Sequence, residues 1–181
     1  MRHVRTAIAL AATLATCSAS TLAQSLVTLP DTSQTTSMMV TISEQARVAV
    51  PAGISFNVTN IAASTSATTA TVAVDQILLA SATKQLRVSL QAAAASFTPP
   101  ASGAATWTAA DVSWNAAAWT AATGTAGTLS NSVFTAVATC SAGATACSTT
   151  SLVFSLAARP AVRRSGAHTL VVVWKVESIG S

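Results

Sequence analysis

Charged and aromatic residues are scarce in this sequence. Only 8% of the 181 residues are charged, 4% are aromatic, and tyrosine is absent. No two of the five acidic residues lie within three positions of each other. General acid–base catalysis needs paired carboxylates, or a carboxylate beside an imidazole. We therefore expect a protein that is not an enzyme.

Long apolar runs are also missing after the N-terminus. Hydrophobic residues make up 51% of the chain, but alanines scattered among threonine and serine are the largest group of them. No run approaches the roughly 20 residues that a membrane-spanning helix needs. Disordered chains combine low hydrophobicity with high net charge, the opposite of this composition. The sequence thus disfavours both an integral membrane protein and a disordered one, and its length suits one compact domain.

Motifs for cofactors, metals and nucleic acids are absent as well. The chain has no Gly-rich phosphate loop, no HExxH and no EF-hand pattern. After the first 23 residues His168 is the only histidine, so a zinc site of nitrogen and sulfur ligands cannot be assembled. The only adjacent basic residues, Arg163 and Arg164, precede Ser-Gly and are typical of a solvated turn rather than of a nucleic-acid surface. We expect no cofactor, no metal and no nucleic-acid partner.

Residues 1–23 have the layout of a cleavable secretory signal. Arg2 and Arg5 precede a short Ala/Leu-rich stretch, and small residues lead to Ala23, after which we predict cleavage. Loss of this segment lowers the formal net charge from +4 to about +2. An alternative makes Cys17 a lipidation site. Either way the chain is exported, to a periplasm, the cell surface or the medium, with no membrane insertion after cleavage.

Two cysteines remain after the signal, Cys140 and Cys147. An even pair in an exported chain favours a disulfide. The six residues between them include Gly143, so the bridge is expected to staple a loop or hairpin tip. Zinc binding by these cysteines is the weaker alternative, because only one histidine remains after the signal to complete the ligand set.

Several segments alternate apolar and polar residues with the period of two that indicates half-buried strands. The clearest are 38–42, 53–59, 85–91, 151–157 and 168–178, and weaker ones are 47–50, 69–80 and 132–139. The middle of 168–178 is apolar on both faces, which predicts a central strand covered on both sides. Residues 35–181 are therefore expected to form an all-β fold, a single antiparallel sandwich of about seven to nine strands, immunoglobulin-like.

Residues 99–128 form an Ala/Thr/Gly-rich excursion that carries Trp107, Trp114 and Trp119. Exposed tryptophans could stack on sugars. Their spacings of seven and five place them on no single strand face. The alternative, which we favour, is that they fill a core poor in other large side chains.

Residues 24–34 precede the first clear strand and contain Ser-Leu-Val-Thr-Leu-Pro. Leu26, Val27 and Leu29 could complete a neighbour's open sheet edge by strand addition. The alternative is an ordinary first strand of the same molecule.

The ending Arg-Arg-Ser-Gly-Ala-His-Thr-Leu-Val-Val-Val-Trp-Lys-Val, residues 163–176, resembles the last strand of bacterial surface β-sandwiches. WxL-domain proteins and fimbrial subunits close in a similar way. The chain departs from the WxL pattern because Lys175 and Val176 follow Trp174, so cell-wall attachment is not implied. The resemblance implies a bacterial, exported, immunoglobulin-like domain.

Three functions compete on this basis. The first is a non-enzymatic structural protein of the cell exterior, a filament or matrix subunit that assembles with itself or with other surface proteins by strand addition. The second is a carbohydrate-binding module that uses the loop tryptophans. The third, for which the sequence offers the least support, is an exported enzyme. The sequence leaves the oligomeric state open.

Overall fold

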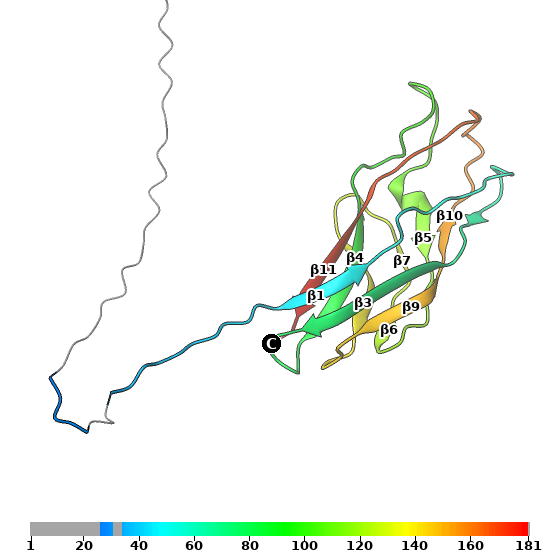
Figure 1. Cartoon of the computed structure of the whole chain (residues 1–181). Coiled ribbons are helices and arrows are strands. Elements are labelled where there is room, and N and C mark those ends of the chain that lie inside the picture. Colours follow the sequence, from blue (N-terminus) through cyan, green and yellow to red (C-terminus); the bar gives the residue numbers. More distant parts are fainter. Residues whose placement is uncertain (1–25, 31–33, 181) are drawn as a thin grey trace, which may run out of the picture. The chain divides into compact units, whose positions relative to one another are not determined.

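The computed structural model describes residues 26–30 and 34–180 (Figure 1). The chain divides into one unit of residues 1–40 and a second of residues 41–181. The described residues of the first unit contain no helix or strand. The expected signal, residues 1–23, and Cys17 lie outside the described residues.

The second unit is built almost entirely from antiparallel sheets (Figure 1). One sheet has the order β1-β3-β9, formed by Gln45–Ala49, Ala70–Leu78 and Cys147–Leu152. Another has the order β2-β10-β5-β7, formed by Thr65–Ser66, Phe154–Leu156, Val112–Trp114 and Gly127–Thr128. The last has the order β11-β4-β8-β6, formed by Val172–Ile179, Gln85–Ala92, Thr135–Cys140 and Ala122–Gly124. Among the described residues one 3₁₀ turn, η1, covers Ala109–Asp111.

The core draws on strands of different sheets. Val72 of β3 and Leu152 of β9 belong to the same buried cluster as Leu90 of β4 and Val137 of β8. These side chains come from alternate positions of their strands, because successive residues of a strand point to opposite faces. A second buried cluster contains Val88 of β4 and the two cysteines.

The expected strands 85–91 and 69–80 are confirmed as β4 and β3. The described chain has eleven strands rather than seven to nine, because residues 99–128 add three strands of only two or three residues. Segment 151–157 spans the end of β9 and all of β10, which are separated by Val153.

Three strand predictions are wrong in an informative way. Residues 38–42 form no strand, and neither do residues 53–59. The last strand is not central: β11 lies at the edge of its sheet, and Val173 on its outer face is 44% exposed. Alternation predicts which side chains face the core. A strand also needs a neighbouring strand that pairs with its main chain, and alternation does not predict whether that neighbour exists.

Candidate functional site

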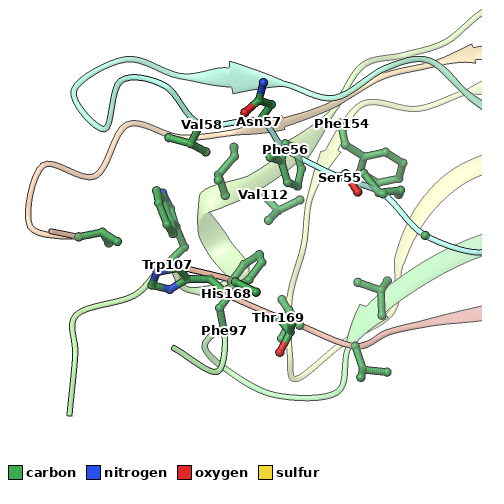
Figure 2. A pocket seen from close by; sticks show the side chains of 18 of the residues that line it. Ser55, Phe56, Asn57, Val58, Phe97, Trp107, Val112, Phe154, His168 and Thr169 are labelled. Atoms are coloured by element: carbon green, nitrogen blue, oxygen red, sulfur yellow. The ribbon is translucent and has the colours of Figure 1, made fainter. Parts of the chain in front are cut away.

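A groove of about 980 Å³ runs between two extended stretches of the chain. One wall is the continuation of β1, residues 51–58. The other is the segment that leads into β11, residues 163–172, together with Trp174. Figure 2 shows Phe56 and Val58 on one side of it and Phe97, Trp107 and His168 on the other.

The first wall is extended and half-buried. Ile54, Phe56 and Val58 are partly buried and pack against the main core cluster, whereas Ser55 and Asn57 are exposed. The alternation that the sequence predicts is therefore present in the side chains. The backbone, however, is not paired as in a strand. Within the part of the chain that the structure describes, residues 51–59 make no main-chain hydrogen bond.

The second wall also presents an unpaired backbone. The N–H of Ala93 donates to the carbonyl of Val171 over 2.9 Å, and β11 continues in register along β4. In an antiparallel ladder, alternate residues point their N–H and C=O groups to opposite sides. The main-chain groups of Val172, Trp174 and Val176 therefore point away from β4. Among the described residues no strand pairs with β11 on that side.

The floor of the groove is apolar. Its side chains come from the loop after β4, from β5, from the loop after β7 and from β10, and they are Phe97, Trp107, Val112, Leu129, Phe154 and Leu156. Most of these belong to the main buried cluster. Except for Phe97, which is partly buried, these side chains are only 3–5% exposed, so the exposed apolar surface of the groove comes mainly from its walls.

A short hydrogen-bonded turn holds part of this floor in place. The carboxylate of Asp111 accepts hydrogen bonds from the N–H of Thr108, over 2.7 Å, and from its hydroxyl, over 2.8 Å. Arg159 pairs with the same oxygen. Burial alone would raise the pKa of Asp111, but these donors outweigh it, and the pKa lies below its ordinary value of 3.8. The carboxylate fixes η1 between Trp107 and Val112.

The rim is polar at one end. His168 Nδ1 lies 2.8 Å from the hydroxyl oxygen of Thr106, and its Nε2 lies 3.3 Å from the carbonyl oxygen of Arg164. Arg163 and Arg164 line this end, and no carboxylate is among the residues that line the groove. No cluster of three or more potential metal ligands occurs in the described chain. This arrangement can bind an extended apolar segment, but it offers no acid–base pair.

The structure does not bring the three predicted tryptophans together on a surface. Trp107 is 5% exposed and donates from Nε1 to the carbonyl of Ala157 over 3.0 Å. Trp114 is 3% exposed and donates to the carbonyl of Thr125 over 2.9 Å. Trp119 is partly buried against both core clusters. Buried indoles have no free face for a sugar ring.

The predicted disulfide is present. Cys140 ends β8, Cys147 begins β9, and the bridge closes the short loop between them. Gly143 in that loop has a φ of 71°, a conformation that glycine adopts without a steric cost. The bridge lies outside the groove and staples the hairpin, as expected.

The proposed donor residues Leu26, Val27 and Leu29 lie in the described part of the first unit, in no strand and exposed. The groove itself was not predicted. Its signal was the alternation of Ile54, Phe56 and Val58, which we interpreted as a paired strand.

The chain matches no family model, no curated protein and no solved structure. Among the described residues no helix is long and apolar enough to cross a membrane.

Proposed function

We propose that this protein is an exported, non-enzymatic structural subunit of the cell exterior, whose groove accepts an extended apolar segment as a missing strand. In this proposal the domain is an immunoglobulin-like sandwich with one edge position vacant. Strand addition joins subunits into a filament or matrix. The resemblance of residues 163–176 to the ending of bacterial surface sandwiches agrees with this proposal.

One observation carries the proposal: an unpaired main-chain edge and an apolar floor occur in the same groove. Edge strands with open N–H and C=O groups are templates for pairing with another chain, and proteins normally cover or charge them. Here the edge of β11 carries inward-facing Val172 and Trp174, with Phe154 and Leu156 also lining the groove. An added strand would pair with this main-chain edge and cover the exposed parts of Val172 and Trp174 together.

The energetic scale supports stable assembly. Each fully buried aliphatic side chain of an added strand contributes about 1.5 to 3 kcal/mol, and each ladder hydrogen bond about 1 kcal/mol net. A strand of three inward side chains and several ladder bonds can offset the entropy lost on association. The buried tryptophans give no comparable support to a carbohydrate site.

The test compares two neighbouring valines that face opposite ways. Val172→Glu places a carboxylate in the groove, whereas Val173→Glu places it on the exposed outer face. Oxidised chains of residues 24–181 are followed by light scattering and negative-stain microscopy over a range of concentrations. We expect the wild type and V173E to form oligomers or filaments and V172E to remain monomeric.

Folding is checked separately, because V172E adds charge next to the core. Far-UV circular dichroism establishes that each variant is folded, and the milder Val172→Thr keeps the volume while adding a hydroxyl. Weaker assembly of folded V172T supports the proposal. Assembly of V172E and V172T at wild-type levels, or a wild type that stays monomeric and binds no apolar peptide, overturns it.

A further inference from the structure

We infer that the strand which fills the groove is the segment Thr36–Ile42 of a second copy of this chain, antiparallel to β11. This inference rests on the proposed function and names the occupant of the same groove. It differs from the sequence-based prediction, which placed the donor at Leu26, Val27 and Leu29.

The segment has the side-chain pattern that the groove needs. Met38, Val40 and Ile42 occupy every second position, so they share one face of an extended strand. They are 91%, 86% and 72% exposed, and none lies in a strand. Such a run of exposed aliphatic side chains is characteristic of an interaction segment.

The earlier segment fits less well. On a strand, Val27 and Leu29 share one face and Leu26 lies on the other, so at most two of these aliphatic side chains point the same way. Pro30 follows directly and has no N–H to donate to a ladder. Residues 36–42 contain no proline and present three apolar side chains on one face.

The segment cannot fill the groove of its own domain. Ile42 is three residues from Gln45, where β1 begins, and this connection spans at most about 11 Å. If the chain doubles back at Ser43 and Glu44 along the free edge of β1, Met38 comes opposite Ala49. Met38 to Ile42 then lie beside β1, below the groove wall that starts at Pro51. The occupant is therefore a second copy.

The register follows from the faces. The side chains of Leu170, Val172 and Trp174 pack toward the core, and their main-chain groups point to the open side. Antiparallel pairing of Ile42 with Leu170, Val40 with Val172 and Met38 with Trp174 places all six side chains on the core face. The main-chain groups of the same residues then form the ladder.

The register also fixes which residues lie at the two ends of the added strand. Glu44 of the donor copy comes level with His168 of the acceptor, while its carboxylate stays paired with Lys84 and the N–H of Ala80 of its own domain. Arg163 and Arg164 line this end of the groove, and no ion pair is formed by either within the described chain. With only Ser43 and Glu44 between donor strand and β1, successive copies stack closely.

The experiment separates donor from acceptor. Val40→Asp charges the inward face of the donor, and Thr41→Asp charges its outward face as the matched control. We expect V40D to lose assembly and T41D to keep it. A mixture of V40D, which retains its groove, with V172E, which retains its donor, should form dimers only, because a single interface remains possible in that mixture.

Peptides identify the occupant directly. Unassembled V40D protein is titrated with a peptide of residues 35–43, with its Val40→Asp version, and with a peptide of residues 25–33. Binding is followed by the intrinsic tryptophan fluorescence, because Trp107 and Trp174 line the groove. We expect saturable binding of the first and at least tenfold weaker binding of the second. Binding of 25–33 in preference to 35–43 overturns the donor assignment and leaves the proposed function standing. Absence of binding by all three, with assembly of V172E at wild-type levels, overturns both.

Discussion

The imidazole of His168 meets the indole of Trp107 edge to face, with ring centroids 5.2 Å apart and planes at 86°. Both side chains line the groove, and each is held by its own hydrogen bond, to Thr106 and to the carbonyl of Ala157. The ring contact and the two hydrogen bonds hold both side chains in place at the polar end of the groove. Trp107 is 5% exposed, and His168 is partly buried.

This geometry predicts that Trp107→Ala destabilises the fold. Removal of a large buried aromatic side chain costs about 3 to 5 kcal/mol of unfolding free energy, because it leaves a cavity. Trp107→Phe keeps most of the volume and loses the hydrogen bond to Ala157, so it should cost less. Urea unfolding of oxidised monomeric protein measures both. A Trp107→Ala variant as stable as the wild type contradicts the core assignment.

The disulfide is expected to make a modest contribution to stability. Cys140 and Cys147 close a loop with a sequence separation of 7, and in the chain-entropy model such a loop contributes about 2 to 3 kcal/mol. The double variant Cys140→Ala and Cys147→Ala should lose about this amount in urea unfolding. Reduction of the wild type with a dithiol is the control that leaves the buried volume unchanged. Equal stability of oxidised and reduced protein refutes the prediction.

Acid should weaken the fold partly through Asp111. Its pKa is lower in the folded chain than its ordinary value of 3.8, so the ionised form is stabilised by folding. That stability is fully present above about pH 4 and is lost as the pH falls through the folded pKa. Asp111→Asn should lower the unfolding free energy at pH 7 by about 1 to 3 kcal/mol, because it weakens the bonds from Thr108 and Arg159.

The same variant should show a shallower loss of stability below pH 4 than the wild type. Asp75→Asn is the matched control. The pKa of Asp75 is also lowered, mainly by its hydrogen bonds from Arg47, but this pair is exposed and contributes little. Thermal unfolding between pH 2.5 and 7 compares the three proteins. An Asp111→Asn profile parallel to the wild type over that range contradicts the role of Asp111.

Individual segments show how far the sequence leads. The alternation of Leu86, Val88 and Leu90 predicted β4 correctly, because this strand has neighbours on both sides and a buried face. The same pattern at Ile54, Phe56 and Val58 predicted the side-chain orientation correctly and the pairing wrongly. Residues 168–178 looked central because valines occupy both faces, yet the outer valines are exposed on an edge strand.

The candidate site could not be predicted from the sequence. Phe97 and Trp107 lie on one loop, where the N–H of Phe97 donates to the carbonyl of Trp107, but they meet Leu129 and Phe154 only through long-range packing. Their spacing carries no common period, since two loops and one strand position them. Composition favoured a core position for the tryptophans, and Trp107 and Trp114 are buried, but the open edge beside them had no local signal.

The sequence by itself determined the β character of the chain and the pairing of Cys140 with Cys147, because alternation and short loop closure are local properties. The scarcity of acids, and with it the absence of a local acid–base cluster, is likewise set by composition. Only the tertiary structure decided that β11 is an edge and that a groove opens beside it. Strand neighbours are chosen over long separations, as between Val72 and Thr149, and a vacant edge exists only once all other pairings are made.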